Sequence, residues 1–305
     1  MKKAVYLTEA QVGAVADALA ASGLPAVSAY EVGKAFFLKA TAQSQRDKAV
    51  FHGMLEHLLT VRLLTRLPLQ GGAEGYLLFG QGHARAQDIA CSLDPFAYVS
   101  HLSAMEYHGL TDRFPKIVFM STPPATNWRQ QAREKMHKDL GERYEEYIAL
   151  GLPRLTRLNL TRIGQSSIQF HERSQFGAFR HVQGTPLRVA TIGRVFLDML
   201  REPSLCGGIQ HVIDIYEAEA KRHLRAIVDE VERHGKPIDK VRAGYLLTEV
   251  CRLHHPVIDT WLDYAQRGGS RKLDPEGEYL PTFSERWMLS INVPSLTTDQ
   301  GGDGD

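Results

Sequence analysis

The sequence predicts an α+β protein of two domains, in which a small helical segment precedes a larger mixed α/β part. Its length of 305 residues suits two domains of ordinary size. Hydrophobic residues make up 43% and charged residues 23%, which is typical of a globular chain. Three helical stretches and a hairpin come first, and short apolar runs alternate with helices afterwards. We therefore expect a domain over 1–82, a connector over 83–93, a second domain over 94–294 and a disordered, Gly- and Asp-rich tail over 295–305.

Two capping boxes mark the first two helices. Thr8 is followed three residues later by Gln11, and Ser28 is followed by Glu31. In this motif the hydroxyl and the Glu or Gln side chain satisfy backbone N–H groups reciprocally, so helices should start near residues 9 and 29. The first helix should end near Gly23, since glycine commonly follows the last turn.

The third helix should begin after Ser44. Its apolar residues recur at the spacing of one helix face: Phe51, Met54, Leu55, Leu58 and Leu59. Strand-like runs over 63–69 and 75–79, with Gly-rich residues between them, predict a hairpin. Three helices followed by a hairpin predict a winged helix-turn-helix, in which the last helix enters the major groove and the hairpin reaches the flanking backbone.

One side of the third helix carries the residues expected to meet DNA. On a helical wheel Arg46, Ala49 and Gly53 lie opposite the apolar face, and Gln45 and His52 lie at its borders. Small side chains would let the groove come close, while Arg46 and Gln45 carry donors that suit guanine and adenine. Three short helices and a hairpin also occur in domains that bind only proteins, and that alternative stays open.

Charge is unevenly distributed although the net charge is only +1. Residues 1–82 hold 8 Lys and Arg against 6 Asp and Glu, so the predicted winged helix is only weakly basic. Its expected phosphate contacts are Lys48 and Arg66. Residues 115–190 hold 12 against 6, and residues 191–305 hold 14 against 19. We expect Arg129 and Arg133 of the basic centre to add to the DNA surface, with solvated helix faces as the equally open alternative.

The larger part should begin with a helix capped by Asp94-Pro95. We expect a polar, exposed helical stretch over 127–147 and, after Thr191, a helix on which Arg194 and Asp198 stand four residues apart on one face. The expected role of the two residues is an i, i+4 ion pair worth a few tenths of a kcal/mol, with a functional contact as the alternative. A small sheet is expected from four runs: Ile117–Met120, Leu158–Arg162, Ser167–His171 and Leu187–Ala190. Further helices are expected over Ile209–Glu219, Lys221–His234, Ile238–Arg252 and Pro256–Gln266, before a closing strand over Trp287–Asn292.

No motif for catalysis, metal binding or phosphate binding is found, so we expect no enzyme, no metal and no cofactor. Cys91, Cys206 and Cys251 form no CxxC pair and should be reduced thiols. The chain opens without a charged leader and has no apolar run near the roughly 20 residues that span a bilayer, so we expect a cytoplasmic protein without membrane contact. A Mg²⁺-dependent nuclease of restriction type stays an alternative.

That nuclease would need three residues to converge on one cation, namely Asp198, Glu219 and Lys221. Glu219 and Lys221 have the E-x-K spacing of some nucleases, but they lie in a helical run rather than on a strand. His101 and His108 are assigned no chemistry, because single histidines on helices are more often packed or solvated than catalytic.

Three segments together resemble the AbiEi-type antitoxins, a family of bacterial transcriptional regulators from type IV toxin–antitoxin modules. They are YVSHLSAMEYHGLTDRFPKIVFMST at Tyr98–Thr122, VATIGRVFLDML at Val189–Leu200 and VRAGYLLTEV at Val241–Val250. The resemblance implies a winged helix that represses its own promoter at inverted repeats in double-stranded DNA, and a C-terminal domain that provides antitoxicity in phage defence by abortive infection. It also implies a nucleotidyltransferase-type toxin as functional partner, without a stable complex.

The sequence departs from that family at Gly193, where an acidic residue usually precedes the arginine. A role for a carboxylate at this position is therefore not expected here. A winged-helix regulator whose C-terminal domain senses a ligand or another protein remains the second alternative.

Overall fold

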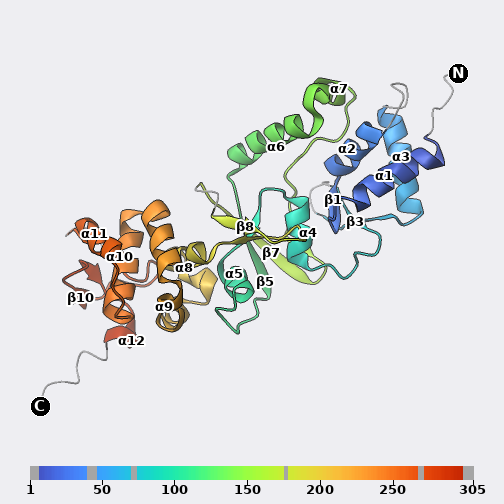
Figure 1. The fold of residues 1–305 in the computed structure, drawn as a ribbon. Coiled ribbons are helices and arrows are strands. Elements are labelled where there is room, and N and C mark those ends of the chain that lie inside the picture. The colour runs from blue at the N-terminus through green and yellow to red at the C-terminus, as the bar shows by residue number, and fades with distance from the viewer. Residues whose placement is uncertain (1–6, 40–46, 70–73, 175–177, 267–270, 298–305) are drawn as a thin grey trace, which may run out of the picture. The chain divides into compact units, whose positions relative to one another are not determined.

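The computed structural model describes residues 7–39, 47–69, 74–174, 178–266 and 271–297. It is a mixed α/β protein with several small sheets, which confirms the predicted class (Figure 1). Two compact units divide the chain. The first unit comprises Met1–Tyr98, Lys116–Phe176 and His181–Arg188, and the second comprises Val99–Pro115, Gly177–Arg180 and Val189–Asp305.

The first unit opens with three helices, α1 (Glu9–Ala20), α2 (Ala29–Lys39) and α3 (Lys48–Thr60). Both predicted helix starts are confirmed. The Thr8 side chain and Gln11 form the complete capping box at α1, and Ser28 Oγ accepts the backbone N–H of Glu31 at 3.3 Å.

A three-stranded antiparallel sheet lies with these helices. It consists of β1 (Ala26–Ser28), β2 (Leu64–Arg66) and β3 (Gly75–Leu78), in the order β1-β3-β2. Strands β2 and β3 form the predicted hairpin, and Leu64 pairs with Leu78. Strand β1, which is only three residues long, was not predicted.

Helix α4 (Ala86–Leu93) occupies the segment that was expected to be a polar connector. Its Ile89, Cys91 and Leu93 are buried. Asp94 ends this helix instead of beginning one, so the predicted N-cap at Asp94-Pro95 is wrong. The guanidinium of Arg188 donates hydrogen bonds to the carbonyl oxygens of Cys91 and Asp94, which satisfies acceptors that a helix end leaves free.

Helix α6 (Ala125–Leu140) and helix α7 (Tyr144–Ala149) cover the stretch expected to be exposed. That expectation is wrong for one face of α6, which shares a single hydrophobic core with α1, α2 and α3. The residues of α6 in this core recur every four positions: Trp128, Ala132, Met136 and Leu140.

The remaining strands of the first unit include β5 (Ile117–Thr122) and β7 (Ser166–Glu172), which pair in parallel along their length. Strand β6 (Arg162–Ile163) pairs with β7 in the antiparallel direction. Of the run predicted as a strand over Leu158–Arg162, only Arg162 lies in β6. Leu158 and Leu160 are nonetheless buried, which explains their strand-like apolar pattern.

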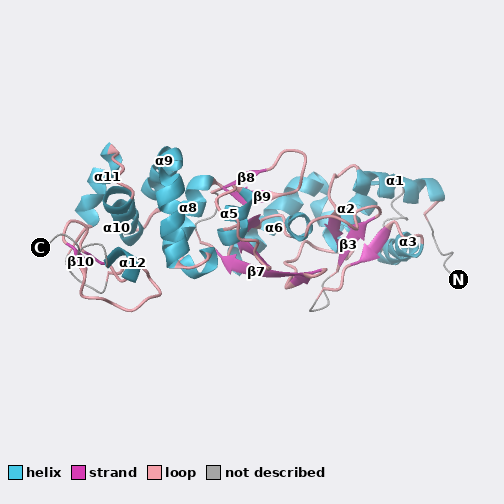
Figure 2. Cartoon of the chain, turned by 90° about the horizontal axis from the view of Figure 1, so that it is seen from below, coloured by secondary structure: helices cyan, strands magenta, loops and turns pink. Residues whose placement is uncertain are grey.

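The second unit contains α5 (His101–Tyr107) and, in a parallel pair, Val99 of β4 (Tyr98–Val99) and Val189 of β9 (Arg188–Ala190). Figure 2 shows the C-terminal half of this unit as mainly helical. Its helices are α8 (Ile192–Arg201), α9 (Ile209–His234), α10 (Pro237–Tyr245), α11 (Pro256–Thr260) and α12 (Pro294–Thr297). The remaining strands are β8 (Phe179–His181), β10 (Phe283–Ser284) and β11 (Leu289–Ser290). Helix α9 is continuous, so the predicted break between Glu219 and Lys221 is wrong.

Helix α8 is buried over nearly its whole length, because it packs closely on α9. A Cβ on Gly193 would lie 2.3 Å from the carbonyl oxygen of Ala226, so only glycine fits at this approach. The predicted i, i+4 ion pair forms between Arg194 Nε and Asp198 Oδ1 at 2.9 Å. Its side chains are 2% and 0% exposed, so the few tenths of a kcal/mol expected of a solvated helix pair do not apply to it.

Within the described residues, no helix combines the length and apolar character needed to cross a membrane.

Candidate nucleic-acid interface

Helix α3 separates a buried face from a polar face. Phe51 and Leu58 on the buried face are at most 1% exposed, and Phe36 contacts Phe51 edge to face. On the other face lie the predicted DNA-contacting residues Lys48, Ala49, His52 and Gly53, all of which are exposed. The helix starts at Asp47, whose side chain accepts the backbone N–H of Ala49. The two predicted base-reading residues, Gln45 and Arg46, lie outside the described residues.

Gly53 lies on open surface. Apart from its chain neighbours and the nearby backbone of α3, a Cβ built on it would meet no atom of the described residues within 4 Å. Glycine within a helix costs about 1 kcal/mol relative to alanine, so its presence here has no explanation in the packing of α3. Gly13 on the exposed side of α1 is in the same situation. Of these two glycines, Gly53 is the one that lies on the face expected to meet DNA.

Arg66 on β2 is not free to act as an isolated phosphate contact. Its Nη2 donates to Glu56 Oε1 on α3 at 2.6 Å, and the two side chains are 54% and 62% exposed. The hydrogen bond from Arg66 to the Glu56 carboxylate raises the pKa of the guanidinium. A phosphate at this point must therefore share or displace the Glu56 contact.

Lys48 lies in the first turn of α3 beside the turn that follows α7. Its Cδ is 3.9 Å from the point that a Cβ on Gly151 would occupy. Arg154, three residues further on, is exposed. The chain turns after α7 at Gly151, whose φ of 65° lies in the left-handed region.

Arg129 and Arg133 are exposed on the outer side of α6. They stand four residues apart, so they lie on the same face of the helix. Arg129 Nε donates to the carbonyl oxygen of Ala125 at 3.1 Å. Because α6 shares its core with α1, α2 and α3, these two arginines belong to the same compact unit as the polar face of α3.

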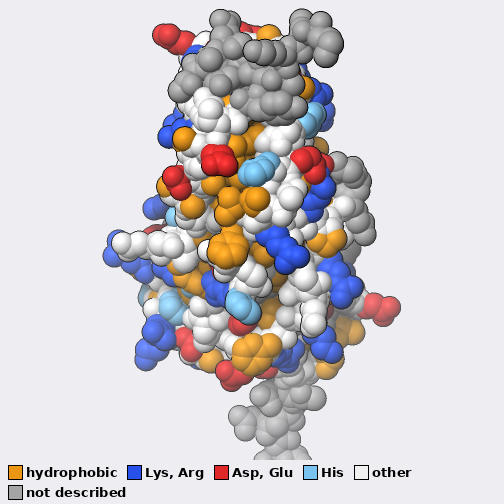
Figure 3. Space-filling model, turned by 90° about the vertical axis from the view of Figure 1, so that its right-hand side faces the viewer, with side chains coloured by type: hydrophobic (Ala, Val, Ile, Leu, Met, Phe, Trp, Pro, Cys, Tyr) orange, Lys and Arg blue, Asp and Glu red, His pale blue; other side chains and the backbone are white. Residues whose placement is uncertain are grey.

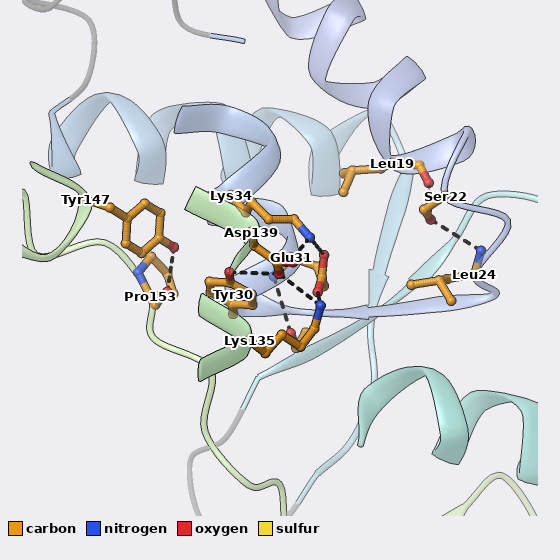
Figure 4. Close-up of polar contacts among 11 residues, drawn as sticks. Leu19, Ser22, Leu24, Tyr30, Glu31, Lys34, Lys135, Asp139, Tyr147 and Pro153 are labelled. Atoms are coloured by element: carbon orange, nitrogen blue, oxygen red, sulfur yellow. Dashed lines mark hydrogen bonds and ion pairs between the residues drawn. The ribbon is translucent and has the colours of Figure 1, made fainter. Parts of the chain in front are cut away.

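A cluster of polar side chains joins α2 to α6 (Figure 4). Asp139 Oδ2 accepts hydrogen bonds from the Tyr30 hydroxyl at 3.0 Å, from Lys135 Nζ at 2.9 Å and from Lys34 Nζ at 3.4 Å. Lys34 also pairs with Glu31 within α2. Although burial disfavours the charged carboxylate, the hydrogen bond from Lys135 and the charges of Lys34 and Lys135 lower the pKa of Asp139.

The consequence of this cluster is that Lys34 and Lys135 are neutralised inside the unit and are poor candidates for DNA contacts. A second contact holds α2 nearby. The Tyr147 hydroxyl donates to the carbonyl oxygen of Pro153 at 2.6 Å and lies against Gly33, where a Cβ would come within 2.6 Å of it. Helix α2 is therefore held in place by α6 and by the chain that follows α7.

Exposed apolar side chains also occur on this unit. Val61, Leu63 and Phe79 are 48%, 37% and 75% exposed. Figure 3 shows one face of the molecule with a central strip of hydrophobic side chains, around which lysine and arginine side chains are spread together with some acidic ones. Such a surface combines the cations that phosphates need with apolar contacts.

The three residues that the nuclease alternative requires are held apart. Asp198 is fully buried and accepts from Arg194, whose Nη1 lies 3.9 Å from Glu230 on α9. Glu219 precedes Glu230 by eleven residues on the same continuous helix, which corresponds to roughly 16 Å of helix rise. Lys221 is exposed. Within the described residues, no three His, Cys, Asp or Glu side chains are grouped so that they could hold a metal ion.

The two histidines of α5 and its end make structural contacts. His101 Nε2 lies 3.0 Å from Glu202 Oε2, and His108 Nε2 lies 2.7 Å from the carbonyl oxygen of Ala190. All three cysteines are free thiols, and burial raises the pKa of Cys91 and brings that of Cys251 to about 12.

Among known proteins, a likeness is found in structure and not in sequence. No family model matches the chain, and no curated protein matches it. A crystal structure titled as the RV2827C protein from Mycobacterium tuberculosis is similar over 97% of this chain and 97% of its own, with 14% sequence identity and a TM-score of 0.45.

Proposed function

We propose that the first unit binds double-stranded DNA as a winged helix, with α3 in the major groove and the β2–β3 hairpin at the flanking backbone. The observation that carries the proposal is the element order α1-β1-α2-α3-β2-β3, with the antiparallel sheet order β1-β3-β2 and an exposed polar face on α3. A helix that is packed on one side and small and polar on the other suits the width of a major groove.

Each part of this surface has its own role in the proposal. Ala49 and Gly53 allow close approach, His52 offers ring nitrogens to base edges, and Lys48 neutralises a phosphate. Arg129 and Arg133 extend the cationic surface beyond α3. Because these contacts are mainly with phosphates, affinity should fall steeply as the salt concentration rises.

We further propose that this binding represses the promoter of the protein's own operon and that the protein acts as an antitoxin. The support for this role is the resemblance of the three sequence segments to AbiEi-type antitoxins. The functional partner would be a nucleotidyltransferase-type toxin that forms no stable complex with this chain. Co-expression of the two proteins, followed by size-exclusion chromatography, tests the last point, and a stoichiometric complex would contradict it.

The decisive experiment for DNA binding is a titration of the full chain against two fluorescent duplexes, the intergenic DNA upstream of its own operon and a shuffled duplex of equal length. We expect tighter binding to the upstream duplex. The variant Lys48→Ala should weaken binding to both duplexes by a similar factor of roughly threefold to tenfold, as expected for a phosphate contact.

The variant His52→Ala should instead reduce the preference for the upstream duplex. Lys236→Ala, an exposed lysine of the second unit, serves as the matched control and should bind like the wild type. Equal binding to the two duplexes, unchanged by Lys48→Ala and His52→Ala, would contradict the proposal. Cleavage of the duplex in the presence of Mg²⁺ would favour the nuclease alternative.

A further inference from the structure

The second unit contains a pocket of about 340 Å³ that the proposed DNA binding does not use. Four parts of the chain form it: the end of α5 with the residues after it, strand β8, the start of α8, and α9. Its lining residues with chemistry are His108, Arg180, Thr191, Glu219, Arg222 and His223. Its volume lies at the lower end of the range of about 300–1,000 Å³ for small-molecule sites.

Two arginines from separate elements give the pocket its charge. Arg180 comes from β8, and its guanidinium lies 5.9 Å from the centroid of the Tyr107 ring. Arg222 comes from α9 and lies 4.0 Å from the single lining carboxylate, that of Glu219. Among the described residues, no carboxylate lies within ion-pair distance of Arg180. The guanidinium fork matches the oxygens of a phosphate, and one carboxylate leaves an excess of positive charge.

The start of α8 adds oriented N–H groups. Four N–H groups at a helix start have no partner within the helix. Here the N–H of Thr191 donates to the carbonyl oxygen of Ala178, and Thr191 Oγ1 accepts the N–H of Arg194 at 3.4 Å. Ile192, which carries one of the other two N–H groups, lines the pocket. The positive end of the helix dipole therefore faces the same space as the two arginines.

Two imidazoles complete the lining. His108 Nε2 lies 2.7 Å from the Ala190 carbonyl oxygen, and since a carbonyl oxygen only accepts, Nε2 carries a proton. Burial and the charges of Arg180 and His223 lower the pKa of His108, although the hydrogen bond to the Ala190 carbonyl oxygen acts to raise it. Burial and Arg222 lower the pKa of His223, against the nearby Glu219. Both rings are thus largely uncharged at neutral pH and can take up a proton when an anion arrives.

We infer that this pocket binds the terminal phosphate group of a small phosphorylated molecule. A terminal phosphate presents three free oxygens to arginines, imidazoles and the helix start together. A phosphodiester within a duplex carries substituents on both sides, so it presents only two free oxygens to the same groups. The part of the pocket formed by Gly109, Leu110 and Ile192 leaves room for a compact organic group.

Isothermal titration calorimetry of the full chain without DNA tests the inference, with inorganic phosphate, adenosine monophosphate, adenosine and a short duplex as probes. We expect phosphate and the monophosphate to bind, and adenosine not to bind. Arg180→Ala and Arg222→Ala should each weaken phosphate binding at least about tenfold, because each removes a charge-assisted hydrogen bond. Arg225→Ala, an exposed arginine one turn further along α9, is the matched control and should bind like the wild type.

Both arginines of the pocket are exposed, so the variants should fold, and their unfolding temperatures without phosphate check that they do. Phosphate binding that is absent, or that survives both substitutions, would overturn the inference. Binding of the duplex alone, lost in Arg180→Ala, would also overturn it and would assign the pocket to nucleic acid. Since no DNA is needed for the phosphate titration, its result is independent of the proposed DNA binding.

Discussion

Arg66 on strand β2 donates a hydrogen bond to Glu56 on helix α3 at 2.6 Å, so an exposed ion pair joins the hairpin to the helix proposed to enter the major groove. The pair places a negative charge beside the proposed DNA surface. It also occupies the arginine that the sequence suggested as a phosphate contact.

Replacing Glu56 by glutamine should therefore tighten DNA binding. The substitution removes a charge that repels phosphates and releases Arg66. We therefore expect roughly threefold to tenfold higher affinity for any duplex. The slope of log affinity against log salt concentration should also become steeper, by the amount of about one added phosphate contact. Fluorescence titrations at several salt concentrations measure both quantities. Glu9→Gln, an exposed glutamate of α1, is the control. Weaker binding of the Glu56 variant would mean that the carboxylate positions Arg66 for the DNA.

Gly53→Ala should separate stability from binding. A methyl group at this position meets no other atom of the described residues, so the better helix propensity of alanine should stabilise the fold by up to about 1 kcal/mol. On the proposed DNA surface the same methyl group would hold the groove away, and affinity should fall roughly threefold to tenfold. Gly13→Ala should give the stability gain alone. Equal DNA affinity of the two variants would remove α3 from the proposed interface.

Asp139→Asn tests the polar cluster between α2 and α6. A folded-state pKa below the unfolded value of about 4 means that the carboxylate contributes stability above pH 4 and loses it as the pH falls through the lowered pKa. We expect the variant to be less stable by about 1–3 kcal/mol at pH 7, with a difference that shrinks on acidification. Urea unfolding at a series of pH values measures this difference. Asp17→Asn, an exposed carboxylate of α1, should show no such trend.

Gly193→Ala should destabilise the second unit in spite of its helix propensity. The added Cβ would lie 2.3 Å from the Ala226 carbonyl oxygen and 2.9 Å from Glu230 Cβ, so α8 and α9 must move apart. A loss of about 1–3 kcal/mol is expected, and thermal unfolding compared with that of Gly13→Ala measures it. A stability equal to that of the wild type would show that the helices do not pack this closely.

The phosphate pocket should bind a divalent anion more tightly as the pH falls. A bound anion favours the charged imidazoles, and the pKa values of His108 and His223 lie below the ordinary value of about 6.5 in the free protein. Sulfate is the suitable probe, because it keeps its charge in this range. Its affinity should rise between about pH 7 and pH 5, and substituting both histidines by glutamine should flatten the profile. A flat profile in the wild type would exclude proton uptake by these rings.

Local signals in the sequence predicted the elements whose partners are close along the chain. The capping box at Thr8 and the side chain of Ser28 mark the starts of α1 and α2, and the apolar spacing from Phe51 predicted the buried face of α3. Polar residues such as Asp88 concealed α4, whose other side is buried. Strand β1 was missed because three residues are too few to show an alternation.

Features that depend on partners far along the chain could not be predicted. The four buried residues of α6 recur at every fourth position, which is typical of one helix face. Nothing in the local sequence shows that this face packs against α2 and α3. Likewise, the i, i+4 spacing of Arg194 and Asp198 is the same on a surface helix and on a buried one. In the candidate site, the sequence predicted the exposed residues of α3 but not the Arg66–Glu56 contact, which joins two different elements.

The core shared by α6 and the first three helices determines which fragments of this chain can be made. A fragment that ends at residue 82 would lack Trp128, Met136 and Leu140, and it would present the bare side of α2 and the unpaired Tyr30 hydroxyl to water. A truncated protein for binding studies must therefore extend at least through Leu155, the last core residue of this cluster, to be soluble and correctly folded.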